Sequence, residues 1–314
     1  MQAMILRAPG SALELLRVSD PIPGPGQLLV KVEACGICRT DLHVVDGELP
    51  HARSPIIPGH EIVGTVVEVG ANVESFGRGI RVGIPWLAST CGTCIYCRGG
   101  RENLCDNARF TGYTVDGGYA EYVLADPAYV GRLPSNVDFS AMAPVLCAGL
   151  TVYKGLKQLE CKPGDWVAIS GIGGLGHLAV QYACAMGFHV AAVDIDDGKL
   201  ALAKKLGAEL VVNAMHTSPA KELQRALRGA HGVLVTAVSP KAFEQALGML
   251  HKRGTMVLLG LPPGEFALPI FDVVANAKTI RGRLPILKYE CAKAHGRGVE
   301  YRGRRGVAIS RYIA

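Results

Sequence analysis

Four cysteines crowd into fifteen residues of the chain, at a spacing that suits a metal ion. They are Cys91, Cys94, Cys97 and Cys105, and their thiolates can close an all-sulfur tetrahedral shell around zinc with no open position. Two disulfides or free thiols are the competing interpretation, which a reducing compartment disfavours. The spacing therefore predicts a structural zinc lobe over about residues 86–110.

A second possible metal site is dispersed along the chain. Cys38, His60 and Cys147 would supply two thiolates and one imidazole, which leaves a fourth zinc position free, as in catalytic sites. Spacing alone leaves this assignment open, because a lone cysteine in an apolar segment, such as Cys147, is more often a buried small hydrophobe. Cys35 and Cys38 also form a Cys-x-x-Cys pair, but no thioredoxin-like pattern surrounds them.

A glycine-rich segment follows an apolar run and opens a helical pattern, the context that a dinucleotide-binding G-x-G-x-x-G motif requires. It consists of Gly171, Ile172, Gly173, Gly174, Leu175 and Gly176. Its backbone can approach a pyrophosphate, whereas tight packing alone is the alternative role for these glycines. Asp194, 18 residues after the last glycine, can accept hydrogen bonds from ribose hydroxyls and would repel a 2′-phosphate, which favours NAD. Lys199 could reach the same ribose, although a solvated helix lysine is a close alternative.

The elements that position these residues follow two patterns. Residues 1–150 carry short β-branched runs between turn residues, at 28–32, 62–69 and 120–124, which predict an irregular and mostly antiparallel β domain. From about residue 151 the apolar runs become continuous, typical of parallel strands covered on both faces. These runs are 167–170, 190–193, 210–212, 233–235 and 256–259, and helical segments at 177–186, 199–206 and 241–250 alternate with them. The alternation predicts a doubly wound α/β sheet, with 154–164 as the connection between domains.

The composition is that of a globular protein. Its 314 residues, 49% hydrophobic and 19% charged, indicate roughly two domains with a large core. No apolar run approaches the roughly 18 residues of a membrane helix, and no basic leader precedes a long apolar stretch at the N-terminus. We therefore expect no membrane association and a cytoplasmic location.

The net charge of +6 is unevenly distributed. Residues 281–314 hold nine of the 33 Lys and Arg residues but only two of the 27 Asp and Glu residues, so the body of the chain is near neutral. Like-charge runs are commonly solvated and poorly ordered, which is our expectation for an atypical basic tail over residues 283–314. An arm that binds nucleic acid is the alternative, but no nucleic-acid motif is recognisable and we expect no such partner.

Jointly, these patterns resemble the zinc-dependent medium-chain alcohol dehydrogenases, specifically the bacterial NAD-dependent branch. The shared motifs are Gly-Ile-Cys-Arg-Thr-Asp-Leu-His at 36–43, Pro-Gly-His-Glu at 58–61, the four-cysteine lobe, Gly-Gly-Tyr-Ala-Glu-Tyr at 117–122, Leu-Cys-Ala-Gly-Leu-Thr-Val-Tyr at 146–153 and Gly-Ile-Gly-Gly-Leu-Gly-His at 171–177. The resemblance runs from about residue 3 to residue 282. It implies a GroES-like β-rich catalytic domain over residues 1–150 and a Rossmann NAD-binding domain over residues 151–282. It also implies that Cys38, His60 and Cys147 hold a catalytic zinc, which makes two zinc ions per chain.

The same resemblance implies roles for neighbouring residues. Asp41 would hydrogen-bond the ring nitrogen of His60 that faces away from the metal, and Glu61 would lie just behind the zinc. Thr40 would contact the substrate hydroxyl, and His43 would pass its proton to solvent. The other implied contacts are Arg39 with the cofactor pyrophosphate, Thr236, Ala237, Leu259, Gly260 and Leu261 beside the cofactor, and Leu49 and Trp86 in the substrate pocket, although these last two could be ordinary core.

The implied activity is oxidation of a primary alcohol to an aldehyde, and the reverse, with hydride transfer to NAD. A dehydrogenase of secondary alcohols or formaldehyde adducts is a variant of this hypothesis. The main rival is a non-catalytic remnant that binds zinc and nucleotide, because the sequence of residues 283–314 does not show the pattern of a strand and an amphipathic helix with which the family continues. The expected partner is a small-molecule alcohol or aldehyde, and the resemblance implies a homo-oligomer, either a dimer or a tetramer.

Overall fold

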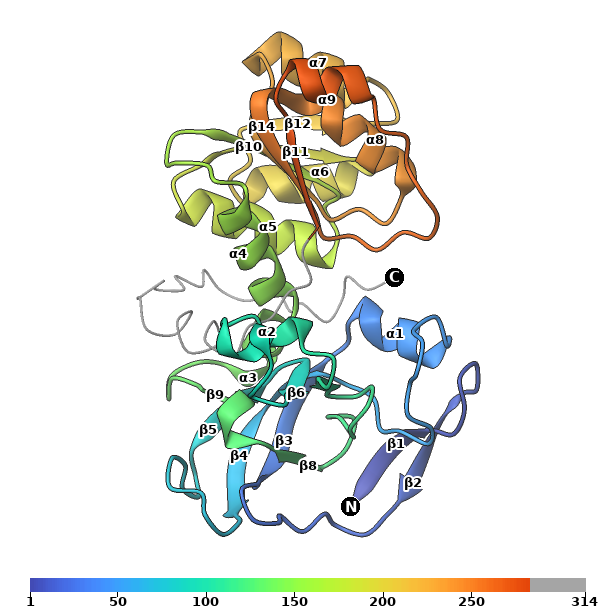
Figure 1. Cartoon of the computed structure of the whole chain (residues 1–314), viewed down its shortest axis with the longest axis vertical. Coiled ribbons are helices and arrows are strands. Elements are labelled where there is room, and N and C mark those ends of the chain that lie inside the picture. The colour runs from blue at the N-terminus through green and yellow to red at the C-terminus, as the bar shows by residue number, and fades with distance from the viewer. Residues whose placement is uncertain (283–314) are drawn as a thin grey trace. The chain divides into compact units, whose positions relative to one another are not determined.

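The computed structural model describes residues 1–282, which form two compact units (Figure 1). The first unit spans Met1–Leu150, and the second begins at Thr151. The division lies where the sequence changes from short β-branched runs to continuous apolar runs. The basic tail expected over residues 283–314 lies outside the described residues.

The first unit is built on an antiparallel five-stranded sheet with the order β8-β3-β4-β5-β9. Its strands are β3 (Leu28–Gly36), β4 (Glu61–Val69), β5 (Arg81–Ile84), β8 (Tyr122–Ala125) and β9 (Gly131–Arg132). In the register of β3 with β4, Gly36 pairs with Glu61. The chain segments that carry Cys38 and His60 therefore leave the sheet from the same end, side by side.

Shorter elements surround this sheet. They are the hairpin β1 (Gln2–Leu6) and β2 (Leu13–Arg17), helix α1 (Arg39–Val45), the pair β6 (Leu87–Ser89) and β7 (Arg109–Phe110), helices α2 (Ile95–Arg98) and α3 (Phe139–Met142), and the 3-10 turns η1 (Glu102–Leu104), η2 (Pro127–Tyr129) and η3 (Ala143–Leu146). The sheet core includes the fully buried Val30, Ile62 and Val82. Each such side chain stabilises the fold by about 1.5–3 kcal/mol, so the sheet is a rigid base for the loops at its end.

The second unit holds a six-stranded parallel sheet with the order β12-β11-β10-β13-β14-β15. The strands are β10 (Trp166–Ser170), β11 (His189–Asp194), β12 (Leu210–Asn213), β13 (Ala230–Val235), β14 (Leu250–Leu258) and β15 (Thr279–Gly282). The chain order reverses between β10 and β13, which is the switch point at which doubly wound sheets bind nucleotides. This order confirms the predicted doubly wound sheet.

One helix precedes the first parallel strand, and the others connect the strands. They are α4 (Ala148–Gln158), α5 (Gly174–Ala185), α6 (Asp197–Lys205), α7 (Pro219–Leu227), α8 (Pro240–Met249) and α9 (Ile270–Ala275). Helices α5 and α6 contact each other and cover β10 to β12, whereas α7 and α8 contact each other and cover the strands from β12 to β14. Because the crossovers are right-handed, the two helix pairs lie on opposite faces, and both faces of the apolar strands are buried.

Two details of the predicted pattern need correction. The connection predicted over residues 154–164 is wrong in its first part, because α4 extends to Gln158. Val152, Leu156 and Leu159 recur at helical spacing there and are buried, so the segment has a packed apolar face. The helix predicted from residue 177 begins at Gly174, because the last glycines of the G-x-G-x-x-G segment form its first turn.

Within residues 1–282, we find no single helix whose length and apolar composition would span a membrane. One pair of consecutive segments, Phe139–Leu146 and Ala148–Gln158, passes the length and composition criteria together, with a bend of 47° between them.

Candidate metal and cofactor sites

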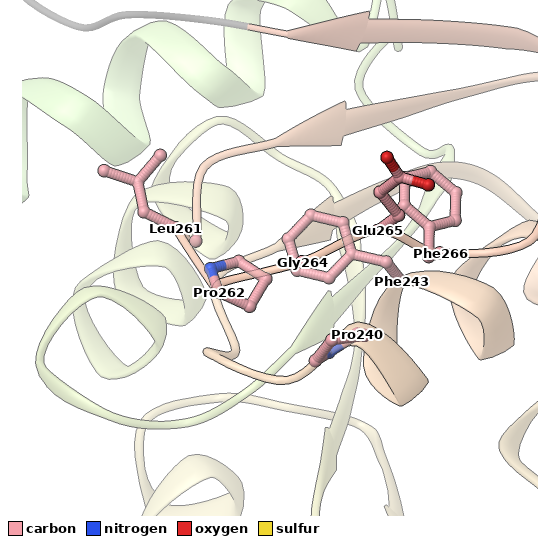
Figure 2. Close-up of a pocket in the computed structure, with 8 residues that line it drawn as sticks. Pro240, Phe243, Leu261, Pro262, Gly264, Glu265 and Phe266 are labelled. Atoms are coloured by element: carbon pink, nitrogen blue, oxygen red, sulfur yellow. The ribbon is translucent and has the colours of Figure 1, made fainter.

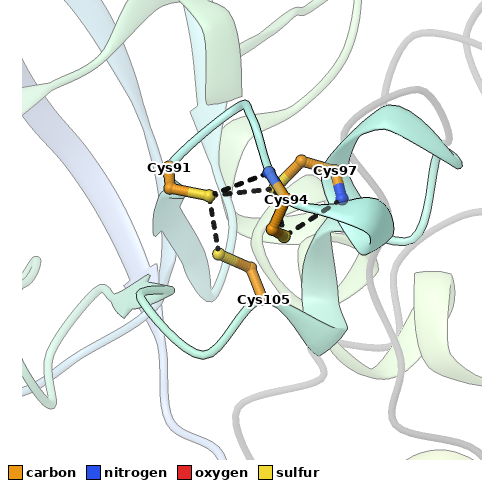
Figure 3. A group of neighbouring side chains, drawn as sticks. All are labelled: Cys91, Cys94, Cys97 and Cys105. Carbon is orange, nitrogen blue, oxygen red and sulfur yellow. Dashed lines mark hydrogen bonds between the residues drawn. The ribbon is translucent and has the colours of Figure 1, made fainter.

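The four cysteines of the loop between β6 and β7 converge on one point, as Figure 3 shows. The Cys94 and Cys97 sulfurs are 3.5 Å apart, the Cys91 and Cys105 sulfurs are 3.5 Å apart, and Cys91 lies 3.9 Å from Cys97. These separations exceed the roughly 2.05 Å of a disulfide bond, so none of the four is paired with another. The two-disulfide alternative is therefore absent from the described structure.

Backbone N–H groups point at two of these sulfurs. The amide of Cys94 donates to Cys91 Sγ at 3.4 Å, and the amide of Cys97 donates to Cys94 Sγ at 3.5 Å. Hydrogen bonds from the Thr93 and Cys94 amides lower the pKa of the Cys91 thiol to about 6. A low pKa favours the thiolate form that binds metal, so the loop fits a tetrahedral zinc ion with four sulfur ligands.

Cys38, His60 and Cys147 also converge, although they come from three separate segments. Their ligand atoms and a carboxylate oxygen of Glu61 all lie within 4.8 Å of one another. Cys147 Sγ is 3.8 Å from Cys38 Sγ and 3.3 Å from His60 Nε2. Two sulfurs, one imidazole nitrogen and one nearby carboxylate fit a zinc ion that keeps a position for an oxygen ligand.

Asp41 fixes the orientation of the imidazole. Its Oδ1 atom lies 2.8 Å from His60 Nδ1, which makes Nδ1 the protonated nitrogen and leaves Nε2 facing the sulfurs. Its Oδ2 atom accepts the Cys38 amide at 2.8 Å and the Tyr119 hydroxyl at 3.1 Å. Asp41 is only 2% exposed and His60 is fully buried, so water cannot replace these partners.

The side chains of this cluster shift one another's pKa values. A hydrogen bond from the Cys147 thiol outweighs burial and lowers the pKa of Cys38 to about 4. Burial opposes the charged form of His60, but the Asp41 carboxylate and the Cys38 thiolate together raise its pKa to about 10. The same Cys38 hydrogen bond, together with burial, raises the pKa of Cys147 well above its usual value. A zinc ion would thus displace protons from His60 and Cys147.

Glu61 is buried beside the cluster. It is 3% exposed, and burial raises its pKa to about 8. Gly36, its partner across β3 and β4, leaves the space that the carboxylate fills, because a Cβ atom at Gly36 would lie 2.0 Å from Glu61 Oε2. The structure thus places Glu61 next to the three proposed ligands, and its role behind the zinc stays a prediction.

Helix α1 carries the remaining polar residues predicted for catalysis. The Thr40 hydroxyl lies 3.8 Å from Cys38 Sγ, whereas the neighbouring Arg39 is exposed. His43 is half-buried, and its Nδ1 contacts the carboxylate of Glu48, a residue that sequence reasoning missed. After α1 the chain turns at Gly47, whose φ is +74°, a signal that could have placed Glu48 back against the helix.

Trp86 lies against the metal cluster. Its ring is 4.9 Å from the His60 ring in an edge-to-face arrangement, and it stacks on Phe110 at 5.3 Å and on Tyr113 at 5.5 Å. Leu49 packs in the same hydrophobic cluster as Trp86 and Tyr113. Phe110 and Tyr113 were not predicted as pocket residues, because their side chains reach Trp86 only through the fold.

The glycine segment has the conformation that a close ligand requires. Gly171 has a φ of +96°, and a Cβ atom at Gly176 would lie 1.8 Å from the carbonyl oxygen of Gly171. By contrast, nothing lies within 4 Å of a Cβ atom placed at Gly173 or Gly174. These two glycines start α5, so a pyrophosphate can approach free amide groups at the N-terminus of a twelve-residue helix. Ile172 and Leu175 belong to the same turn.

Asp194 ends β11 and contacts this turn. Its Oδ2 atom accepts the Ile172 amide at 2.5 Å, and Oδ1 accepts the Ile195 and Asp196 amides at 2.8 and 3.1 Å. The carboxylate is therefore held at the edge of the sheet, beside the glycine turn, as the motif predicts. Lys199 is half-buried in the first turn of α6.

The predicted residues at the ends of β13 and β14 meet the same glycine turn. Thr236 Oγ1 donates to the Gly171 carbonyl at 2.6 Å, and the Ala237 amide donates to the Ser170 carbonyl at 3.0 Å. A Cβ atom at Gly260 would lie 2.2 Å from the Ala237 carbonyl oxygen. Leu259 is buried and Leu261 is exposed. The structure thus gathers all three loops at the carboxyl edge of the sheet.

A small cavity of about 170 Å³ opens at this edge (Figure 2). Its lining is Pro240, Phe243, Gly260, Leu261, Pro262, Gly264, Glu265 and Phe266. Cofactor-sized pockets usually enclose about 300–1,000 Å³, so this cavity is too small for a dinucleotide. Its mostly apolar lining also distinguishes it from the glycine turn, where the phosphates would bind.

Two family models match the sequence. Residues 24–135 match the alcohol dehydrogenase GroES-like domain, and residues 174–295 match the zinc-binding dehydrogenase domain. The second match continues to residue 295, so the expectation that the resemblance ends at residue 282 is wrong.

Curated relatives and solved structures agree with these matches. The alcohol dehydrogenase of Moraxella sp. (strain TAE123) is 58% identical over 285 residues, which cover 90% of this chain and 84% of the relative. That of Rhizobium meliloti (strain 1021) is 54% identical over 309 residues, covering 98% of this chain and 90% of the relative.

Among solved structures, a zinc-binding dehydrogenase of Sinorhizobium meliloti 1021 bound to NADP gives a TM-score of 0.87 at 32% identity, covering 93% of this chain and 86% of that one. The alcohol dehydrogenase of Aeropyrum pernix gives 0.84 at 32% identity, covering 93% and 88%. Both of the expected folds, GroES-like and Rossmann, are thereby confirmed. With relatives of this similarity over nine-tenths of its length, the chain belongs to the zinc-binding alcohol dehydrogenases of the medium-chain family.

Proposed function

We propose that this zinc-dependent alcohol dehydrogenase oxidises a primary alcohol to an aldehyde, and catalyses the reverse reduction, with NAD as the hydride carrier. The family supplies the reaction class, which is alcohol oxidation with a nicotinamide dinucleotide. The observation that carries the proposal is the convergence of Cys38, His60 and Cys147, of which the first and last are 109 positions apart in the sequence.

The chain's own residues prepare this cluster for an alcohol. Zinc held by the three side chains would stabilise the deprotonated alcohol, much as it lowers the pKa of bound water from about 15.7 to about 7. Asp41 keeps the Nε2 lone pair of His60 directed at the metal position. The Thr40 hydroxyl would accept a hydrogen bond from the alcohol and relay a proton by releasing its own toward His43, whose Nε2 would pass a proton to solvent. A bound nicotinamide would supply the acceptor for the hydride of the substrate carbon.

The preference for a primary alcohol rests on Trp86. Its indole meets the His60 ring edge-to-face and packs against Phe110 and Tyr113, whose rings also contact each other. An aromatic wall beside the metal ligands would limit the room for a second substituent on the carbinol carbon. Leu49, packed in the same cluster, would complete the wall.

The preference for NAD rests on Asp194. Three backbone amides hold its carboxylate at the end of β11. A carboxylate at this position accepts ribose hydroxyls and repels a 2′-phosphate. The Sinorhizobium relative binds NADP, so the choice depends on residues such as this one rather than on the fold. Arg39, Lys199 and the loops at Thr236 and Gly260 would supply further contacts.

NADH formation with a panel of primary and secondary alcohols tests the reaction. Zinc-replete protein should turn over primary alcohols, contain two zinc ions per chain, and lose one ion and its activity in the Cys147→Ala variant. A protein that binds two zinc ions and NAD but oxidises no alcohol would be the non-catalytic remnant. Faster turnover of secondary alcohols would refute the role of Trp86 as a size limit.

Replacement of Asp194 by Gly tests the cofactor. Removing the carboxylate should reduce kcat/KM for NAD by about 10- to 100-fold, because hydrogen bonds to a charged group are lost, and should improve NADP relative to NAD. The exposed Asp197→Gly variant, on the neighbouring helix, is the matched control and should leave the ratio unchanged. Equal use of NAD and NADP by the wild type would contradict the proposal.

We also propose a homo-oligomer and a cytoplasmic location. Ile270, Phe271 and Val274 on α9 are 72, 84 and 74% exposed, and α9 precedes β15, an edge strand of the sheet. Exposed apolar side chains, and a strand that is at the edge of the sheet within residues 1–282, favour association with a second copy. Light scattering should give at least a dimer, and Phe271→Glu should shift it toward the monomer.

The nine unpaired cysteines among the described residues suit a reducing compartment, which cell fractionation would test.

A further inference from the structure

We propose that Tyr119 is a positioning residue for the catalytic metal, which acts through Asp41 and increases the affinity of the Cys38, His60 and Cys147 cluster for zinc. Its hydroxyl donates to Asp41 Oδ2 at 3.1 Å, on the side of the carboxylate away from His60. The inference rests on the proposed function, since it requires zinc at this cluster.

The backbone around Tyr119 is tied to the segment that carries His60. The Tyr119 amide donates to the Pro58 carbonyl at 3.0 Å, and the Gly118 amide donates to the Gly59 carbonyl at 2.9 Å. On the other side, the Met4 amide of β1 donates to the Tyr119 carbonyl at 2.8 Å. Main-chain hydrogen bonds thus hold the Tyr119 backbone on both sides, next to the segment that carries His60.

Gly59 lets the tyrosine ring lie against this segment. Its φ is +95°, and a Cβ atom there would lie 2.5 Å from Cδ1 of Tyr119. Only glycine allows both the backbone conformation and the contact. The residue that precedes the histidine ligand therefore makes room for the ring whose hydroxyl reaches Asp41.

The hydroxyl completes the hydrogen bonding of a buried charge. Asp41 Oδ1 faces His60 Nδ1, and Oδ2 receives the Cys38 amide and the Tyr119 hydroxyl. A phenol that faces a carboxylate can only donate, so Tyr119 supplies Oδ2 with a second hydrogen bond beside that of the Cys38 amide. Without it, Oδ2 would keep a single partner, the Cys38 amide, and the carboxylate could rotate about its Cβ–Cγ bond. The imidazole would then lose part of its alignment with the sulfurs.

Partners of this kind matter for metal affinity. Groups that orient metal-ligating histidines typically change affinity by about 10- to 100-fold when they are removed. Tyr119 is one step further from the metal than Asp41. We therefore expect the Tyr119→Phe variant to show an effect near the lower limit, an approximately ten-fold weaker binding of the catalytic zinc.

Competition with a chromophoric chelator tests this expectation on the full chain, with zinc itself as the probe. The catalytic ion is identified as the one missing from Cys147→Ala, and its dissociation constant is compared between wild type and Tyr119→Phe. Tyr122→Phe, in the same segment but outside the Asp41 hydrogen bonds, is the matched control and should match wild type. A Tyr119→Phe constant within two-fold of wild type overturns the inference.

A double-mutant cycle separates positioning from general stabilisation. If Tyr119 acts through Asp41, its replacement should weaken zinc binding in the wild type but change it less than two-fold in the Asp41→Ala background. An equal loss in both backgrounds would overturn the inference even if the thermal midpoint falls. If wild type and Cys147→Ala bind the same number of zinc ions, the proposed function itself fails. That outcome is distinguishable, because there is then no dissociation constant of a catalytic zinc to compare.

Discussion

The two cysteine clusters differ in how the chain builds them. In the lobe, Cys91, Cys94, Cys97 and Cys105 come from one loop, and backbone amides of the same loop point at the sulfurs. At the catalytic cluster, the ligands come from three segments and are oriented by side chains, chiefly Asp41. The lobe stabilises a loop that has little core of its own, whereas the catalytic cluster depends on a core that is already folded.

This difference explains why one cluster is closed and the other is suited to chemistry. Four thiolates satisfy zinc completely, so an ion in the lobe contributes folding free energy and no open position. The catalytic cluster offers two thiolates and one imidazole, with Thr40, Glu61 and Trp86 arranged around them. On the proposed assignment, the same metal would serve stability in one place and reaction in the other, according to its ligands.

The largest expected effect distinguishes Cys38 from Cys35, the other cysteine of the Cys-x-x-Cys pair. Cys38→Ser should lower alcohol oxidation by about 1,000-fold or more, because it removes a ligand of the ion that stabilises the deprotonated alcohol. It should also reduce bound zinc from two ions to one. Cys35→Ser is the control: Cys35 lies outside the ligand set, so both ions should remain. Metal analysis and NADH formation measure both, and a Cys35 variant that loses an ion would break the comparison.

Loss of the lobe zinc should affect stability instead. Cys97→Ser should remove one zinc ion and lower the free energy of unfolding by several kcal/mol, because metal binding contributes to the folding of the loop. For a unit of this size that corresponds to a fall of about 10 °C in Tm. Calorimetry at matched zinc measures the change. An unchanged Tm with one ion fewer would show that the lobe needs no metal.

The two ions should also leave at different rates. A chelator should extract the catalytic ion about ten-fold faster or more, since a site with three protein ligands and an exchangeable position gives a competing ligand access. Activity should therefore fall before Tm does. Stopped samples assayed for zinc, turnover and Tm follow the order, and a simultaneous loss of activity and Tm would contradict it.

The smallest effect concerns a hydroxyl group in the lobe. Tyr129 hydrogen-bonds Thr90 at 2.6 Å, and Thr90 Oγ1 also accepts the Cys97 thiol at 3.3 Å. Tyr129→Phe should reduce the free energy of unfolding by about 1 kcal/mol, the usual value for one hydrogen bond. Urea denaturation measures it, with Tyr122→Phe as the reference variant. A loss several times larger would mean that the lobe relies on side-chain support as much as the catalytic cluster does.

Much of the fold could be predicted from the sequence because its signals are local. Apolar runs such as 190–193, and the glycines that begin α5, depend on residues close in sequence. The lobe is equally local, since its four ligands span one loop. Helix α4 was missed in its second half because Lys154 and Lys157 interrupt the apolar pattern on its exposed face.

The surroundings of the catalytic cluster could not be predicted in the same way. Cys147 has no local sign of metal binding, and only the family motif singles it out. Two of the missed contacts, those of Tyr119 and Tyr113, join residues that are dozens of positions apart in the sequence. The third joins Glu48 to His43 around a tight turn. Their contacts depend on strand register and backbone turns, which composition and periodicity do not encode.

The separation of Cys38 from Cys147 also has a consequence for the order of events during synthesis. The hairpin, the five-stranded sheet and the lobe are complete by Arg132, before Cys147 emerges. The lobe can therefore take up its ion while the chain is still growing, since closing a short loop is fast. The catalytic ion must wait for contacts 109 residues apart, and such long-range contacts form slowly. With the proposed ligand set, metal loading of the reactive site would thus be a late step that follows the folding of the first unit.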